Sequence, residues 1–171
     1  MALSLSLALA QRRRADDPAT CELLEQTRSE LAGALAELRE LARGIHPAVL
    51  TERGLGAALD ALAGRAHVPV DVRELPGERL PPGVEAAAYY LVAESLTNVA
   101  KYAGASVATV RVCVEDSHVL VEVADDGVGG ADASRGSGIR GLAVRVEALD
   151  GWLDVDSPQG AGTRVSAAIP L

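Results

Sequence analysis

The sequence is poor in cysteine. Only Cys21 and Cys113 occur in 171 residues, and neither has a second cysteine or a histidine at a spacing typical of metal ligands. Two isolated cysteines imply neither a disulfide framework nor a zinc site. We therefore interpret both as reduced thiols and expect a cytoplasmic protein.

Positive charge is also scarce. The formal net charge is −8, from 16 basic and 24 acidic residues, and Lys101 is the one lysine. A general nucleic-acid binder or a protein that binds anionic membranes needs a basic field, so the sequence argues against both classes. The 49% share of hydrophobic residues argues against a disordered chain.

A long apolar run is missing as well. The opening MALSLSLALA is too short to span a bilayer, and no positive charge precedes it as in a signal peptide. We interpret it as the end of an amphipathic helix and expect no membrane contact in this chain. A membrane anchor in a longer parent protein stays open.

Residues 1–47 show a helical pattern. From Thr20 to Ile45 the apolar positions recur at steps of three and four over three heptads, which predicts a narrow seam with charged flanks. A hairpin of two such helices cannot bury both seams alone. We therefore predict part of a dimerisation hairpin, which forms a four-helix bundle in a homodimer. Packing of these helices on the following domain is the alternative.

Residues 48–171 are predicted to form a second domain. The pattern indicates helices over 55–66, 84–103 and 139–151, and strands over 68–74, 106–115, 118–125, 152–157 and 163–171. Most strands are neighbours through hairpins, one of them with a tight turn at residues 116–117. This order predicts an α+β fold, a two-layer sandwich with a mixed or antiparallel sheet and helices on one face.

The helix predicted over 84–103 has two distinct faces. One is apolar and should pack on the sheet; it consists of Val84, Ala88, Leu91, Val92, Ser95 and Val99. The other carries Glu94, Asn98 and Lys101, spaced by four and three residues and thus on one side. An amide oxygen can ligate Mg²⁺, a lysine can neutralise phosphate, and a carboxylate can accept a proton. Phosphate chemistry and a plain solvated face are both open at this point.

A second candidate site is the stretch VADDGVGG, where the strand over 118–125 ends. The alternation of that strand buries its valines, and Asp125 and Asp126 follow. A carboxylate can accept a hydrogen bond from the exocyclic amine of adenine, and glycines beside it let the backbone approach a flat ring. Asp-Gly is also a common turn dipeptide, so a plain turn is the alternative.

The stretch GSGIRG at 136–141 has the glycine spacing of dinucleotide-binding folds. That motif needs a strand directly before its first glycine, and here the nearest predicted strand ends at residue 125. We interpret the stretch as the end of a flexible lid at a helix N-terminus, where backbone N–H groups favour phosphate. Gly136 and Gly138 would permit movement over a nucleotide.

Four motifs follow one another in the order ESLTNVAKYA, DDGVGG, GSGIRGL and GAGTRV. In this arrangement the sequence resembles the ATP-binding domain of the superfamily that joins gyrase B, Hsp90, histidine kinases and MutL. It is most similar to sensor histidine kinases of the nitrate-sensor-like subgroup, which LRELARGIHPAVLTERGLGAAL also resembles. The resemblance implies a Bergerat-type ATP-binding fold, ATP with Mg²⁺, and a response regulator partner with a helix-turn-helix output domain.

The resemblance also implies roles for single residues. Glu94 corresponds to the residue that helps activate the acceptor histidine, Asn98 to the Mg²⁺ ligand, and Lys101 to a phosphate contact. Asp125 corresponds to the aspartate that binds adenine, and Thr163 to a threonine that helps hold this aspartate and a water. The glycines beside the ring and in the lid correspond to Gly127, Gly129, Gly136, Gly138 and Gly141.

A histidine kinase also needs an acceptor histidine that is followed by an acid on a helix. None of His46, His67 and His118 is followed by an acid, so we expect that the acceptor is missing and the chain truncated. The sequence thus predicts the catalytic domain of a sensor histidine kinase, which transfers the γ-phosphate of ATP to a histidine, without autophosphorylation of this chain alone. The alternatives are a non-catalytic, nucleotide-gated dimerisation or regulatory module and an anti-sigma-type serine kinase.

Overall fold

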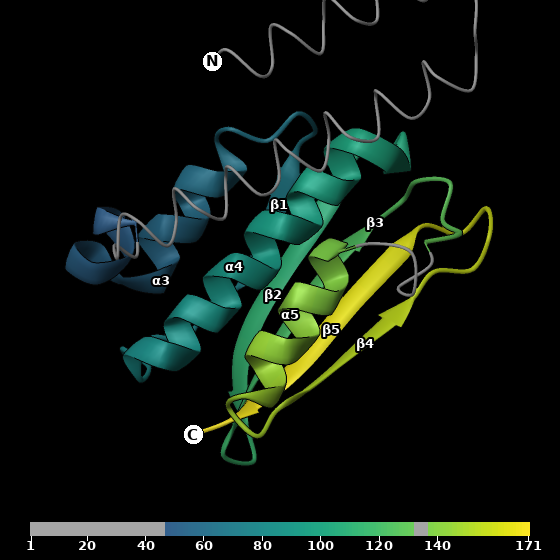
Figure 1. Cartoon of the computed structure of the whole chain (residues 1–171). Coiled ribbons are helices and arrows are strands. Elements are labelled where there is room, and N and C mark those ends of the chain that lie inside the picture. Colours follow the sequence, from purple (N-terminus) through teal and green to yellow (C-terminus); the bar gives the residue numbers. More distant parts are fainter. Residues whose placement is uncertain (1–46, 132–136) are drawn as a thin grey trace, which may run out of the picture. The chain divides into compact units, whose positions relative to one another are not determined.

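Alternating valines build the centre of a five-stranded sheet in the computed structural model, which describes residues 47–131 and 137–171 (Figure 1). Strands β2 (Ala108–Glu115) and β3 (His118–Asp125) pair antiparallel around a two-residue turn. Asp116 and Ser117 in this turn have φ angles of 47° and 63°, as a tight hairpin requires. The valines of β3 that face the helices are buried, as the alternation predicts.

Three further strands complete the sheet in the order β1-β2-β3-β5-β4. They are β1 (Val70–Glu74), β4 (Trp152–Asp156) and β5 (Thr163–Pro170). Strand β1 is parallel to β2, and the other pairs are antiparallel. The prediction of a mixed, mostly antiparallel sheet is therefore confirmed. Each strand also begins and ends within two residues of its predicted limits.

The helices of the described residues cover one face of this sheet (Figure 1). They are α3 (Ala48–Ala63), α4 (Pro82–Asn98) and α5 (Ser137–Glu147). Helix α4 lies over β2 and β3, α5 lies over β4 and β5, and α3 contacts β1 and α4. The predicted two-layer sandwich with helices on one face is confirmed.

The core lies between the two layers. All six members of the apolar stripe predicted on α4 and the turn after it are buried. One of them is polar: the hydroxyl of Ser95 has no hydrogen-bond partner among the described residues. An unpaired buried hydroxyl costs about 1–3 kcal/mol, so the remaining apolar packing has to offset this cost.

A buried carboxylate fixes the start of α4. Glu85 is 2% exposed and accepts hydrogen bonds from Arg79, at 2.8 and 2.9 Å, and from the backbone N–H of Leu80, at 3.2 Å. The Arg79 side chain in turn passes Gly54, where a Cβ would lie 3.1 Å from its Cδ. These contacts join the loop before α4 to α3.

The predicted limits of the first helix of this domain, 55–66, are wrong at both ends. Helix α3 begins at Ala48, ends at Ala63, and is broken at Gly54, which has a φ of 81°. The reason for the early start is Pro47, whose carbonyl accepts a hydrogen bond from the N–H of Leu50 at 2.7 Å. Proline ends the preceding helical pattern, but its fixed φ also suits the start of a new helix.

The helix predicted over 84–103 is present, but its last turn is not α-helical. Helix α4 ends at Asn98, and η1 (Val99–Ala103) continues as a π-helical turn up to Gly104, which has a φ of 56°. A π turn is wider than an α turn. The three-residue step from Asn98 to Lys101 therefore does not have the α-helical geometry that the spacing assumed.

The last helix also ends earlier than the sequence predicts. Helix α5 stops at Glu147, and Asp150 rather than Gly151 takes the left-handed conformation, with a φ of 57°. A Cβ at Gly151 would lie 2.9 Å from Cγ1 of Val146 and would also crowd the backbone of β5. Glycine is needed there for close packing and not for the helix end.

The described residues belong to one compact unit, His46–Leu171. No helix in the described ranges is long and apolar enough to cross a bilayer. Almost all of the hairpin predicted over residues 1–47 lies outside the described residues, and so do Cys21, His46 and Gly136. The division at residue 47 stays a prediction.

Candidate functional site

The two neighbouring aspartates at the end of β3 have different partners. One carboxylate oxygen of Asp126 accepts hydrogen bonds from the N–H groups of Ser106, at 2.7 Å, and Val107, at 3.0 Å. The other accepts one from the Ser106 hydroxyl. These bonds, that of the hydroxyl above all, hold the pKa of Asp126 below its usual range. Asp126 thus ties the end of β3 to the segment before β2.

Asp125 keeps one carboxylate oxygen without a partner among the described residues. Its Oδ1 accepts a hydrogen bond from the N–H of Gly127 at 2.8 Å, which fixes the orientation of the carboxylate. The half-buried side chain lies directly opposite Thr163 of β5. Opposed residues of an antiparallel pair share a face, with Cβ atoms about 4.5–5.5 Å apart. The remaining oxygen of Asp125 can therefore accept a hydrogen bond from an amine that lies beside Thr163.

Thr163 is held by Ser157, a residue that the motifs did not include. The two hydroxyl oxygens lie 2.9 Å apart, and Ser157 Oγ also accepts a hydrogen bond from the N–H of Ala131 at 2.9 Å. Ser157 therefore links Thr163 to the loop that follows DDGVGG. The signal for this residue is the loop SPQGAGT, in which Gly160 and Gly162 have φ angles of 81° and 77° and form a tight turn.

The glycines of DDGVGG make close contacts with other backbone segments. A Cβ at Gly127 would lie 2.8 Å from the carbonyl carbon of Ala103. A Cβ at Gly129, which has a φ of 63°, would collide with the carbonyl of Pro158. Packing inside the protein thus requires glycine at both positions, in addition to the predicted approach of a flat ring.

The end of the α4 segment meets the DDGVGG loop through its backbone. The N–H of Val128 donates a hydrogen bond of 2.8 Å to the carbonyl of Ala103, the last residue of η1. Gly127 passes the same carbonyl and also binds Asp125. The π turn begins directly after Asn98. Asp125 is the last residue of β3 and Asn98 the last of α4, so the two residues belong to adjacent segments. Strand β3 and helix α4 end at the same end of the domain (Figure 1).

Helix α5 covers part of the α4 face that carries Glu94. A Cβ at Gly138 would lie 2.9 Å from the carboxylate carbon of Glu94. Two turns further along α5, the guanidinium of Arg145 lies 4.4 Å from the ring centroid of Tyr90, which is one turn before Glu94. The two helices thus run antiparallel and in contact. Because the side chains of Tyr90 and Glu94 are both half-buried, this part of the α4 face is not a plain solvated surface.

The other predicted site residues are less constrained. Lys101 is exposed in the π turn. A Cβ at Gly141 would have no atom within 4 Å, so no contact of the described structure requires glycine there. Gly136 lies outside the described residues. The structure therefore places Asp125, Thr163 and Gly127 next to one another, on segments that adjoin the turn after Asn98. It also places Gly138 in contact with Glu94.

The donor set at the end of α4 suits Mg²⁺. In the part of the chain that the structure describes, no group of three or more His, Cys, Asp or Glu residues could hold a metal ion. Mg²⁺ needs no such group, because it takes one or two protein oxygens and completes its shell with phosphate and water. The half-buried amide of Asn98, one turn after Glu94, fits this requirement.

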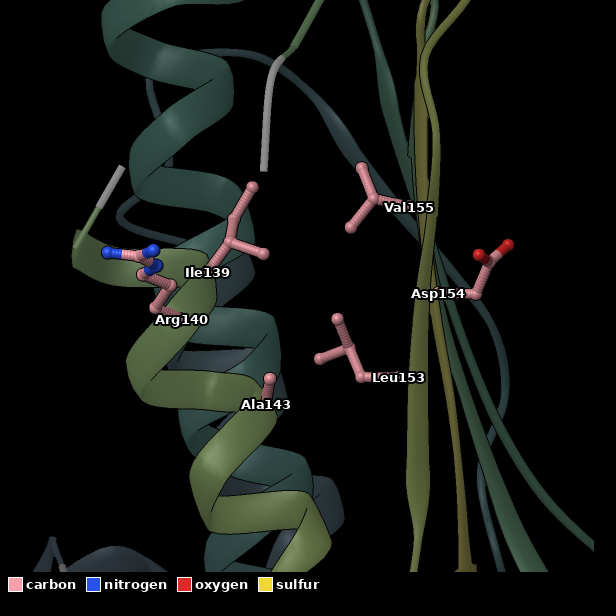
Figure 2. Close-up of a pocket in the computed structure, with 6 residues that line it drawn as sticks. All are labelled: Ile139, Arg140, Ala143, Leu153, Asp154 and Val155. Carbon is pink, nitrogen blue, oxygen red and sulfur yellow. The ribbon is translucent and has the colours of Figure 1, made fainter. Parts of the chain in front are cut away.

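A cavity of about 290 Å³ lies between α5 and β4 (Figure 2). Arg140 and Asp154 border it but point away from it, Asp154 on the opposite face of the sheet (Figure 2). Its apolar lining consists of Ile139, Ala143, Leu153 and Val155. The cavity lies on the edge strand β4, two strands from β3, and it includes neither Asp125 nor Asn98.

The order of motifs on this fold matches a known family. Residues 83–171 match the family described as histidine kinase-, DNA gyrase B- and HSP90-like ATPases. The chain belongs to this ATPase family. The match begins at the start of α4 and includes β2, β3, α5, β4 and β5. The prediction of an ATP-binding domain of the histidine kinase type is therefore confirmed.

Sensor histidine kinases are among the relatives of this ATPase domain. NarS of Mycobacterium tuberculosis is 35% identical over 150 residues, or 82% of this chain and 35% of NarS. YxjM of Bacillus subtilis is 32% identical over 119 residues, or 70% of this chain and 29% of YxjM. The chain thus spans about a third of the length of these curated relatives.

A solved structure shares the fold. The histidine kinase domain of a blue-light activated histidine kinase from Erythrobacter litoralis matches with a TM-score of 0.59 and 24% sequence identity. The match covers 99% of this chain and 95% of that domain. At this identity the likeness extends to the fold alone.

Proposed function

We propose that this chain binds Mg-ATP and is the catalytic part of a two-component sensor histidine kinase. It transfers the γ-phosphate to a histidine, from which a response regulator takes it. The observation that supports this most is the connection between Asp125 and Asn98 through Gly127, Val128 and the end of the π turn. The proposed acceptor of a hydrogen bond from the purine amine, Asp125, and the proposed metal ligand, Asn98, thus lie on adjacent segments.

Four side chains have separate roles in this proposal. Asp125 accepts a hydrogen bond from the adenine amine, and Asn98 offers its amide oxygen to Mg²⁺. Lys101 contacts phosphate oxygens, and Glu94 accepts a proton from the attacking histidine. The bound Mg²⁺ would neutralise charge on the triphosphate. Transfer then depends on positioning and charge neutralisation.

The remaining predicted residues surround the nucleotide in this proposal. Thr163 supports Asp125 from the neighbouring strand, to which the register of β3 and β5 brings it. The glycines that contact the nucleotide are Gly127, Gly129, Gly136, Gly138 and Gly141. We further propose a homodimer through residues 1–47, a response regulator with a helix-turn-helix output domain, and a cytoplasmic location for this chain.

Incubation with γ-labelled Mg-ATP tests the transfer. We expect no label on the chain alone, because none of its three histidines is followed by an acid, and the two described ones, His67 and His118, do not lie in a helix. His118 instead binds the backbone carbonyl of Asp116 at 2.9 Å. Label on any histidine of this chain would contradict the expectation. A protein that supplies an acceptor histidine should become labelled, and its failure to do so would favour the non-catalytic module.

Asn98→Asp is expected to lower the affinity for ATP in the presence of Mg²⁺ by about tenfold, the effect of 1.4 kcal/mol. The new negative charge lies beside the triphosphate, whereas the acid has the same shape as the amide, so we expect the fold to tolerate it. Calorimetry with and without Mg²⁺ measures the effect, and thermal unfolding measures stability. The matched control is Gln159→Glu, which makes the same change on the exposed β4–β5 loop. Equal losses of stability and affinity would indicate a structural role for Asn98.

A further inference from the structure

We propose that Gly138 is a positioning residue for Glu94. Because Gly138 has no side chain, the first turn of α5 lies directly against the Glu94 carboxylate and holds it in one place. This role differs from the movement of a lid, which the glycine spacing alone indicates. The contact itself does not depend on the proposed function, but its effect on phosphoryl transfer does.

The contact is closer than a side chain would allow. A Cβ at Gly138 would overlap Oε1 of Glu94 and would lie 2.9 Å from its Cδ and 3.4 Å from its Cγ. An alanine therefore cannot be added unless one of the two groups moves. The contact involves the end of the Glu94 side chain, which is the part that has to be in place for proton transfer.

The backbone of α5 is the more strongly fixed of the two groups. Leu142 and Val146 are 6% and 1% exposed and anchor the helix in the core. Arg145 packs over Tyr90 of α4, a cation–π contact that fixes the helices against each other. The Glu94 side chain has several rotatable bonds and is not fully buried. A methyl group at residue 138 should therefore displace the carboxylate and leave the helix in place.

Gly141 provides the matched comparison. It lies on the same helix less than one turn later, and a Cβ there would have no atom within 4 Å. Gly141→Ala thus gains the helix propensity of alanine without a steric conflict, and we expect its thermal midpoint to rise by about 2–4 °C. Gly138→Ala should show this rise only in a chain whose Glu94 is truncated to alanine.

The first experiment measures thermal unfolding of Gly138→Ala and Gly141→Ala in the wild-type and Glu94→Ala backgrounds, without nucleotide. NMR of the ¹³C-labelled glutamate side chains accompanies it. We expect the Glu94 carboxylate signal to move in Gly138→Ala and to stay in Gly141→Ala. An equal rise of the midpoint for Gly138→Ala in both backgrounds, with an unmoved Glu94 signal, would overturn the proposal.

The second experiment measures transfer from labelled Mg-ATP to a protein that supplies an acceptor histidine. A misplacement of about 1 Å can lower a rate up to about 100-fold, so we expect Gly138→Ala to lose at least tenfold. In the Glu94→Ala background the same substitution should cause no further loss, and an equal loss in both backgrounds would contradict positioning. If the wild-type chain binds ATP but transfers nothing, the proposed function fails, while the unfolding and NMR results still decide whether Gly138 fixes Glu94.

Discussion

Asp125→Ala is expected to weaken ATP binding by about 10- to 100-fold while the domain stays folded. A hydrogen bond to a charged group in a partly buried site contributes about 1.5–3 kcal/mol, and each 1.4 kcal/mol is a factor of ten. The fold should tolerate the change, because the half-buried carboxylate has a single hydrogen bond within the described structure, to the N–H of Gly127. Calorimetry gives the affinity, and circular dichroism with thermal unfolding shows whether the domain is intact.

Asp126→Ala is the matched control, because it removes a carboxylate from the adjacent position. Asp126 accepts three hydrogen bonds from Ser106 and Val107. We therefore expect a lower thermal midpoint than in Asp125→Ala, with the ATP affinity of the folded molecules retained. Undiminished ATP affinity of Asp125→Ala would count against the proposed site. A loss of affinity in both variants alike would mean that the loop and not one carboxylate binds the nucleotide.

Gly162→Ala is expected to destabilise the domain by about 2–4 kcal/mol, the sum of two costs. The first is conformational, because Gly162 has a φ of 77°, which disfavours any residue with a Cβ. The second is steric, because that Cβ would collide with the carbonyl of Asp125 and lie 3.3 Å from Cα of Asp126. Both neighbours are backbone atoms of β3 and its end, so they cannot turn aside as a flexible side chain does. Urea unfolding measures the loss.

Gly160→Ala separates the two costs of the Gly162 substitution. Gly160 lies in the same loop and has a φ of 81°, but a Cβ there would have no atom within 4 Å. We expect a loss of only about 1 kcal/mol, from the left-handed backbone alone. If both variants lose the same stability, the approach of Gly162 to Asp125 is not a close contact in solution. A larger loss for Gly162→Ala should be accompanied by weaker ATP binding, because the displaced backbone carries Asp125.

Much of the fold was predictable from the sequence. The limits of β3 were predicted without error, because alternation with period two and a turn at Asp116 and Ser117 are local signals. The apolar stripe of α4 was also correct, since helical spacing alone determines which side chains share a face. The errors fell at helix ends. Pro47 can end one helix and also begin the next, so the helical pattern alone did not reveal that α3 starts directly after it. The side-chain spacing likewise does not indicate the π turn after Asn98.

The candidate site was predictable in part. The residue types of Glu94, Asn98 and Asp125 indicated phosphate and purine chemistry, and the matched ATPase family supports that interpretation. The spacing did not reveal that α5 covers Glu94, because Gly138 reaches it from 44 positions later in the chain. Ser157 was missed for the same reason, since its importance comes from hydrogen bonds to Thr163 and Ala131.

The sequence by itself determined the order of elements, the buried faces of β3 and α4, and the chemical groups available for a nucleotide. Each of these follows from side-chain type and local spacing, whereas the family was indicated by the resemblance of four motifs in order. Only the tertiary structure decided which of the two adjacent aspartates keeps a carboxylate oxygen available for a ligand. The partners of Asp126 lie 20 and 19 residues earlier, and the sequence does not show them as neighbours. The tertiary structure also decided why single glycines are required, because a missing Cβ matters only where another segment passes within contact distance.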